Sequence, residues 1–375
     1  MTDLRVVRAD GDPRACGRAI GLGFWDLIER LIDFYYRYFD RRGVTLPELQ
    51  DLLAPYLSAS ETLLPAYVET IKGMAEGAMV PVWELFAINA FEELEPLLES
   101  PDGRPLFLWR KEGYRSAPGP APAGAGGARA ERCSTFTVSG PGYTFLGHNE
   151  HWLAGDTGNA GVVIEAARDG VPAVVSPTVV CCLPAVGMNA ARGAQGINSM
   201  TASDDGVGVP RVLISRYALE AADRSDAVAR ANFAGRAGGY SHVFAFPRGD
   251  TFAVETTGSR VAVIEGPGPH TNHYLDPGLA ELAPEPSEGS LSRFERLTRV
   301  LREEPTDTPE GVMRILRDHD AAPQAVCLHP EEGEDDEASA VVFSMVADVE
   351  HGRMWVAAGN PCETEYEEVD LAGVV

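Results

Sequence analysis

The sequence lacks an uncharged apolar run of the roughly 18 residues that a membrane-spanning helix needs, so we expect no membrane span. Residues 1–5 are polar and lack the apolar core of a secretion signal. The six cysteines are too few and too scattered for a disulfide scaffold. Together these absences predict a cytoplasmic protein whose thiols are reduced.

Lysine is also scarce. Lys72 and Lys111 are the only lysines, and the formal net charge is -25 at pH 7. An acidic chain without a basic stripe repels the phosphates of nucleic acid and of anionic membrane surfaces, so we expect neither as a partner. The acidic run at residues 331–337 is typical of a solvated loop.

The chain changes character near residue 133. Residues 17–100 carry apolar side chains at three- and four-residue spacing, which predicts helices, and Gly73 and Gly77 mark a close approach of two segments. Residues 116–132 are rich in proline, glycine and alanine, which predicts a mobile surface segment. Strand patterns begin directly after that segment.

Alternating and β-branched runs predict the strands beyond residue 133, and helical periodicity returns between them. The predicted strands cover residues 133–138, 143–147, 162–166, 173–181, 242–247, 251–256, 260–265, 340–347 and 353–358. The predicted helices cover residues 210–222, 225–234, 292–303 and 309–317. Because strands follow one another and the helices are grouped, this order favours α+β layers over alternating βαβ units.

Cys133 stands at the boundary between the proline-rich segment and the first strand after it. A buried structural cysteine is the simple interpretation. The functional interpretation is that the Arg132–Cys133 bond breaks, so that Cys133 gains a free α-amine. An α-amine has an ordinary pKa of about 8 and can therefore act as the base for the neighbouring thiol near neutral pH. One residue would then supply both nucleophile and base.

Several short motifs occur in an order that resembles the isopenicillin-N acyltransferase family of N-terminal-nucleophile (Ntn) hydrolases, which includes penicillin acyltransferases and carcinine-type amidohydrolases. The resemblance spans residues 17–362. The matching segments are residues 73–77, Asn89–Glu92, Cys133-Ser134, Gly147–Trp152, Gly187–Asn189, Asn198–Met200, Gly208–Pro210 with Arg216, Leu219 and Glu220, His270–His273, Ser290–Arg296, Asp318-His319, Cys327 with His329, and Gly359 with Pro361.

The resemblance implies a four-layer αββα sandwich with a helical N-terminal pro-region. It implies autocatalytic cleavage into a small chain, residues 1–132, which ends in the loop 116–132, and a catalytic chain, residues 133–375. The implied activity is hydrolysis or transfer of an acyl group on a small-molecule amide through a thioester on Cys133. Natural-product amides and β-alanyl amides are the substrate classes that it suggests.

The resemblance also implies roles for individual residues. Asn272 is the candidate oxyanion donor, since a neutral amide offers two N–H donors; the simpler interpretation of Asn272 is a turn residue between strands. The other implied catalytic residues are Asn149 and His151. The implied substrate-binding residues are Glu150, Trp152, His270 and Arg293.

His151 departs from the family pattern, which usually has an aspartate at this position. An aspartate would hold a terminal ammonium charged, whereas a neutral histidine cannot, although it can carry a proton near pH 7. The departure affects either the cleavage rate or the substrate class. A structural alternative is that His151 points to the opposite face of the sheet.

We expect no metal and no cofactor. In a strand, His148 and Glu150 share a face and His151 lies on the other, which argues against tetrahedral ligation. His319 and His329 have no partner at a ligand-like spacing, and no nucleotide-binding glycine motif follows a strand.

Two alternatives to self-processing catalysis stay open. One is an uncleaved, non-catalytic member of the fold that binds a small molecule or a partner. The other is a thiol hydrolase that uses Cys133 with a histidine and is not cleaved. The sequence does not decide between hydrolysis and acyl transfer.

Overall fold

The computed structural model describes residues 4–98, 133–168, 170–320, 322–331 and 333–371. The segment 116–132, predicted to be mobile, and Arg132 at the predicted cleavage point lie outside these residues. No helix among the described residues is long and apolar enough to cross a membrane.

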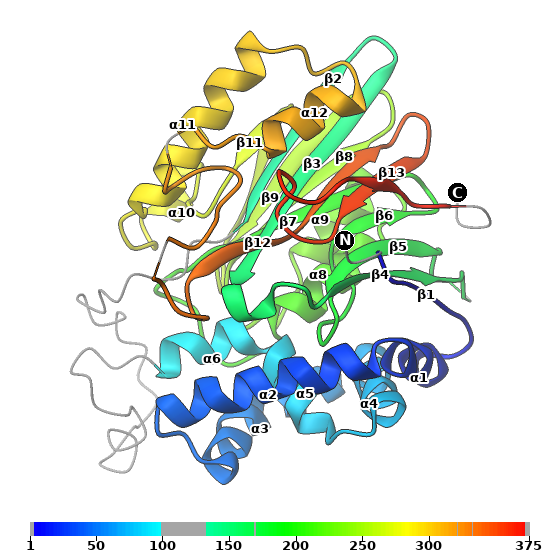
Figure 1. Ribbon diagram of the computed structural model, residues 1–375, viewed down its shortest axis with the longest axis vertical. Helices are drawn as coiled ribbons and strands as arrows, with labels where there is room; N and C mark the ends of the chain where they lie inside the picture. The colour runs from blue at the N-terminus through cyan, green and yellow to red at the C-terminus, as the bar shows by residue number, and fades with distance from the viewer. Residues whose placement is uncertain (1–3, 99–132, 169, 321, 332, 372–375) are drawn as a thin grey trace.

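Two β-sheets face each other in the centre of the molecule (Figure 1). Helices α8 (Arg211–Leu219) and α9 (Arg224–Ala231) contact the first sheet, and helices α11 (Glu288–Glu303) and α12 (Pro309–Leu316) contact the second. The predicted α+β fold with four αββα layers is therefore confirmed.

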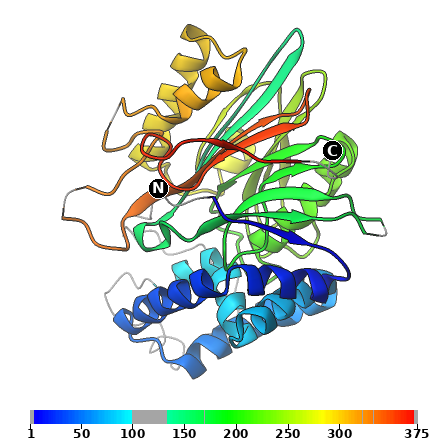
Figure 2. The same cartoon turned by 45° about the vertical axis from the view of Figure 1, so that its right-hand side comes forward.

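The first sheet has eight strands in the order β1-β4-β5-β6-β7-β8-β9-β10. The strands are β1 (Val6–Ala9), β4 (Ala160–Glu165), β5 (Val174–Val179), β6 (Gly187–Asn189), β7 (Ala194–Ser199), β8 (Tyr240–Phe246), β9 (Asp250–Thr256) and β10 (Val261–Glu265). Strand β1, which the sequence pattern did not predict, lies at the edge and pairs in parallel with β4 (Figure 2).

The second sheet has six strands in the order β11-β2-β3-β12-β13-β14. The strands are β11 (Gly268–His270), β2 (Ser134–Gly140), β3 (Tyr143–Leu153), β12 (Ser339–Asp348), β13 (Arg353–Ala357) and β14 (Glu367–Glu368). Strands β2 and β3 form an antiparallel hairpin in which Ser134 lies opposite Asn149. This register places Cys133, directly before β2, beside the end of β3.

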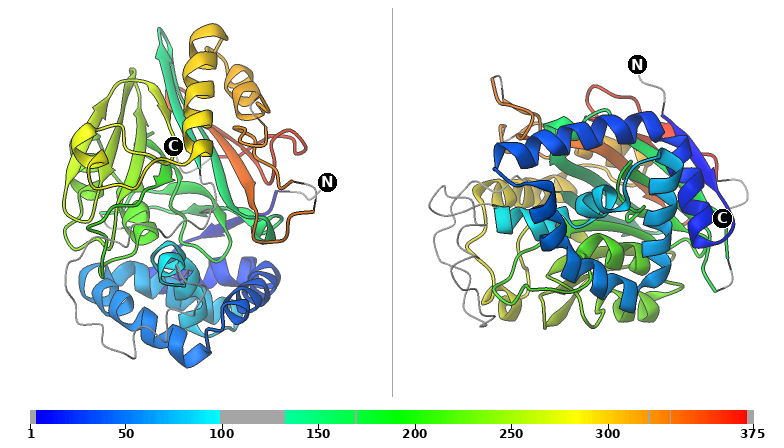
Figure 3. Two further views of the ribbon diagram at one scale, coloured as in Figure 1. Left: turned by 90° about the vertical axis from the view of Figure 1, so that its left-hand side faces the viewer. Right: turned by 90° about the horizontal axis from the view of Figure 1, so that it is seen from below.

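Six helices lie within residues 4–98 of the described chain and extend across one end of the two sheets (Figure 3). They are α1 (Pro13–Gly23), α2 (Trp25–Arg41), α3 (Leu46–Leu63), α4 (Pro65–Ala78), α5 (Val82–Asn89) and α6 (Phe91–Leu98). The short helices η1 (Ala154–Asp156) and α10 (Pro277–Ala280) lie further along the chain.

Glycines allow α1 and α4 to pack backbone against backbone, as the sequence predicted for Gly73 and Gly77. A Cβ atom on Gly73 would lie 2.2 Å from the Arg14 carbonyl oxygen, and one on Gly77 would lie 2.3 Å from that of Arg18. Larger residues at these positions would force the helices apart.

The largest hydrophobic core extends from the N-terminal helices into the sheets. Phe91 of α6 stacks on Trp152 of β3, with ring centroids 6.2 Å apart. The region before the predicted cleavage point therefore has no separate core, and its helices close one end of the sandwich around the start of β2.

Candidate active site around Cys133

Cys133 is buried, with 2% of its surface exposed. Its carbonyl oxygen accepts a hydrogen bond from Asn198 Nδ2 at 2.7 Å and another from Arg293 Nη1 at 3.0 Å. Asn198 belongs to β7 of the facing sheet and Arg293 to α11. Two layers of the sandwich thus fix the backbone of this cysteine.

A carboxylate lies against the thiol. Ligand atoms of Cys133, His148 and Glu150 all lie within 4.8 Å of one another, and Glu150 hydrogen-bonds to the thiol. Glu150 also accepts hydrogen bonds from His148 Nε2 at 2.7 Å and from Trp152 Nε1 at 2.6 Å. Because alternate residues of a strand share a face, β3 presents these three side chains to the thiol together.

The tautomer of His148 follows from this network. A carboxylate only accepts hydrogen bonds, so His148 carries its proton on Nε2, and Nδ1 accepts the hydroxyl of Thr135 at 2.8 Å. Both ring nitrogens of His148 are therefore engaged. Of the two groups, Glu150 is the one that can take a proton directly from the thiol.

The surroundings keep the thiol protonated in the intact chain. Burial raises the pKa of Cys133 well above its ordinary value, and the negative charges of Glu150 and Glu92 raise it further. A hydrogen bond from the His151 backbone N–H lowers it without reversing the effect. A nucleophilic thiolate therefore needs a base that removes the proton during the reaction.

Asn272 is linked to Cys133 through one guanidinium group. Arg293 Nη2 donates to Asn272 Oδ1 at 3.0 Å, while Nη1 of the same residue holds the Cys133 carbonyl. The backbone N–H of Asn272 donates to Ser290 Oγ at 2.9 Å, and its Nδ2 donates to the Ser199 carbonyl at 3.1 Å. These bonds fix the orientation of the amide group.

His270, predicted to bind substrate, faces a different partner. Its Nε2 lies 2.7 Å from Glu255 Oε1, and both side chains are buried. Glu255 also accepts the backbone N–H groups of Leu275 and Asp276. This pair holds the turn that carries Asn272, so the structure gives His270 a positioning role.

Asn149 and His151, both predicted to be catalytic, occupy the other face of β3. Asn149 Nδ2 donates to the carbonyls of Leu316 and Val326, each at 2.9 Å, in the outer layer. Strand alternation directs the His151 side chain to the same face, so only its backbone reaches the thiol. This geometry favours the structural alternative, in which His151 points to the opposite face of the sheet.

Three residues close to Cys133 were not predicted to belong to the site. Asn198 holds its carbonyl, and His148 orients Glu150. Glu92 of α6 raises the pKa of Cys133 and accepts a hydrogen bond from Ser199 Oγ at 2.9 Å. All three lie within segments that resemble the family, so only the order of motifs could have indicated them.

A small cavity adjoins Glu150 between the two sheets. Its walls are mainly apolar and include Trp152, Ile197, Val212 and Phe343, with the hydroxyl-bearing Tyr240. Glu150 and Trp152, which were predicted to bind substrate, thus line the same cavity.

Known proteins resemble this chain in two respects, a family model and the folds of solved structures. Among solved structures, a penicillin V acylase from Agrobacterium tumefaciens has 13% sequence identity and a TM-score of 0.46, covering 64% of this chain and 86% of the other. A variant of a conjugated bile acid hydrolase from Clostridium perfringens has 11% identity and a TM-score of 0.42, covering 64% and 93%. No curated protein matches the sequence. The model of the family described as acyl-coenzyme A:6-aminopenicillanic acid acyl-transferase matches residues 138–363, so the chain belongs to this family.

Proposed function

We propose that the protein is a self-processing Ntn hydrolase that cleaves or transfers an acyl group on a small-molecule amide, with Cys133 as nucleophile. The observation that carries the proposal is the buried Cys133 thiol against the Glu150 carboxylate, with the cysteine backbone fixed by Asn198 and Arg293. A buried structural cysteine would need none of these polar partners.

Self-cleavage would begin with transfer of the thiol proton to Glu150. The sulfur then attacks the carbonyl carbon of Arg132, an S–C bond forms, and the C–N bond to Cys133 breaks. The proton held by Glu150 goes to the departing nitrogen, which becomes the α-amine of Cys133. Water finally opens the thioester, releasing a carboxylate on Arg132 and restoring the thiol.

In the mature enzyme, the new α-amine would take the thiol proton when Cys133 attacks a substrate carbonyl. Glu150, already beside the thiol, would hold the resulting ammonium by charge attraction. The family pattern gives this role to an aspartate at the position of His151. We propose that Glu150 replaces that aspartate, which accounts for the histidine.

The oxyanion formed at each step needs fixed donors, and the loss of one such donor typically costs about 2.7–4 kcal/mol. Asn272 is our candidate, because Arg293 accommodates its Oδ1 and leaves Nδ2 to donate. Arg293 positions both this amide and the Cys133 backbone. The apolar residues that line the small cavity beside Glu150 would contact the acyl group.

Intact-mass analysis of the purified full chain tests the proposal. We expect two fragments, residues 1–132 and 133–375, with Cys133 leading the second, and we expect Cys133→Ala to stay whole. Cys133→Ser is the matched variant, because a hydroxyl retains the geometry but is a weaker nucleophile, so cleavage should slow. A screen of acyl amides then identifies the substrate.

The same experiment separates the alternatives. A wild-type chain that stays whole yet hydrolyses amides would support the uncleaved thiol hydrolase. The geometry argues against that alternative, because both ring nitrogens of His148 are already engaged. A wild-type chain that stays whole and inert would support a binding protein.

A further inference from the structure

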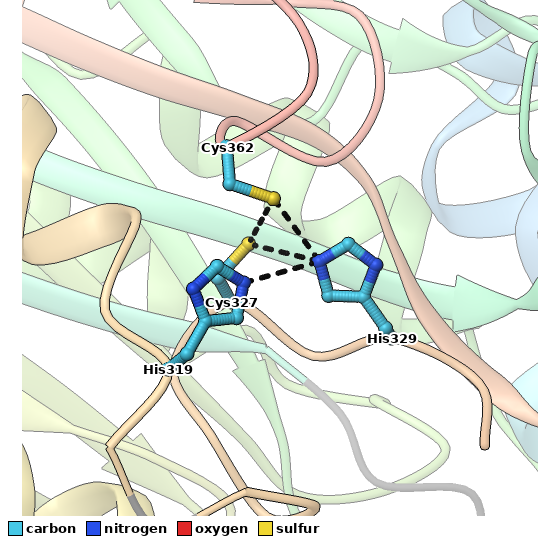
Figure 4. A group of neighbouring side chains, drawn as sticks. All are labelled: His319, Cys327, His329 and Cys362. Atoms are coloured by element: carbon cyan, nitrogen blue, oxygen red, sulfur yellow. Dashed lines mark hydrogen bonds between the residues drawn. The ribbon is translucent and has the colours of Figure 1, made fainter.

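Four potential metal ligands converge in a second cluster that does not include Cys133. They are His319, Cys327 and His329, from the segment between α12 and β12, and Cys362, which follows β13. Figure 4 shows their side chains pointing toward one another. Each offers one ligand atom, and these atoms all lie within 4.8 Å of one another. His319 and His329 have no partner at a ligand-like spacing in the sequence, but the fold brings Cys327 and Cys362 to them.

Four of the six distances between these atoms lie within about 0.5 Å of the edges of a zinc tetrahedron. Zn–S bonds of about 2.3 Å and Zn–N bonds of about 2.0–2.1 Å imply edges of roughly 3.8 Å for S–S, 3.6 Å for S–N and 3.4 Å for N–N. The structure has 3.6 Å between Cys327 Sγ and Cys362 Sγ, and 3.2 Å between His319 Nε2 and His329 Nε2. His329 Nε2 lies 3.7 Å from Cys327 Sγ and 3.1 Å from Cys362 Sγ.

Hydrogen bonding alone does not explain this arrangement. His329 Nε2 faces His319, Cys327 and Cys362 at once. A single imidazole nitrogen has either one proton or one lone pair, so it cannot satisfy three partners. A cation at the centre of the four atoms would satisfy all of them together.

We propose that His319, Cys327, His329 and Cys362 bind one Zn²⁺ ion. Two thiolates and two imidazoles suit zinc, whereas calcium and magnesium prefer oxygen ligands. Asn360 supports the site from outside, since its Nδ2 lies 3.7 Å from Cys327 Sγ and 2.8 Å from the Leu328 carbonyl oxygen. Hydrogen bonds of this kind orient metal ligands in zinc proteins.

Four protein ligands leave no open position for substrate, so the site would be structural. It would join the segment after α12 to the segment after β13, which also meet where Arg317 Nε donates to the Pro361 carbonyl at 2.7 Å. The first segment carries the Val326 carbonyl that holds Asn149 of β3. The metal would therefore fix the outer side of the strand that presents Glu150 to Cys133.

Metal analysis of the full chain tests this site independently of the proposed activity. The protein is purified under reducing conditions with a tag that binds no metal, and we expect about one zinc per chain. The zinc-free chain titrated with Co²⁺ should develop the strong visible bands of a tetrahedral thiolate-bound ion. His329→Ala and Cys362→Ser should lose at least ten-fold in zinc content and lack those bands.

Two controls locate the metal. His351→Ala removes a histidine outside the cluster, and Cys133→Ala removes the thiol of the other group of potential ligands; both variants should keep their zinc. Two outcomes would overturn the proposal: a wild-type chain that binds neither zinc nor cobalt, or zinc retained in both cluster variants. Because Cys362 is exposed, its variant should fold.

Discussion

Glu150→Gln gives the sharpest test of how Cys133 is activated. The change keeps the size of the side chain and removes the charge that lies against the thiol. Glutamine is not a base, and its amide N–H groups cannot accept the His148 and Trp152 donors that a carboxylate accepts. A positioned general base contributes typically about 10²–10⁴-fold, so self-cleavage should slow by that factor.

This loss corresponds to about 2.7–5.4 kcal/mol in the activation free energy, at about 1.36 kcal/mol for each factor of ten. The assay follows the fraction of cleaved chain by intact mass after a pulse of synthesis. Because the charge of Glu150 is one cause of the raised pKa of Cys133, the thiol of the variant should also ionise at lower pH. Alkylation rates measured against pH report that change.

Glu84→Gln is the matched control, since Glu84 is another buried glutamate but lies in α5 and bonds to Tyr36. Its cleavage rate should stay within two- to three-fold of wild type. If Glu150→Gln cleaves as fast as this control, the assignment of Glu150 as the base fails. His151→Asp completes the test: because its side chain faces away from the thiol, the new acid should not speed cleavage.

Three further predictions concern stability. Gly73→Ala should destabilise the fold by about 1–3 kcal/mol in denaturant unfolding, because its Cβ would meet the Arg14 carbonyl, whereas Gly206→Ala, in open space, should change little. Asn149→Ala leaves two backbone carbonyls of the outer layer without their donor. It should lower the free energy of unfolding by about 1–3 kcal/mol for each group and so lower the melting temperature. An unchanged melting temperature would contradict the role of Asn149 between the layers. Burial lowers the pKa of His242 from 6.5 to about 3, so this residue contributes stability above pH 6.5 that is lost as the pH falls toward 3. His242→Phe should flatten the pH dependence of unfolding in that range, and identical profiles would refute the reasoning.

The sequence by itself determined most of the longer elements of the sandwich and their order, but not the strands β6, β7, β11 and β14. Alternation and helical periodicity are local signals, so β5, β8, β9, β12 and β13 and the helices α8, α9, α11 and α12 lie where the pattern predicted them, within a few residues. The order of motifs indicated the family, and Gly73 and Gly77 indicated helices in close contact. Strand β1 escaped prediction because an edge strand of four residues depends on its partner β4.

Only the tertiary structure decided what each side chain of the site faces. A motif such as residues 147–152 names the residues but not the face of the strand that meets the nucleophile, and the register of β2 on β3 brought Glu150 to Cys133 while turning Asn149 outward. A cluster whose residues come from distant segments also has no recognisable spacing in the sequence. Cys362 meets His329 across 33 residues of chain because two loops converge at one end of the sheet, and that convergence is a property of packing.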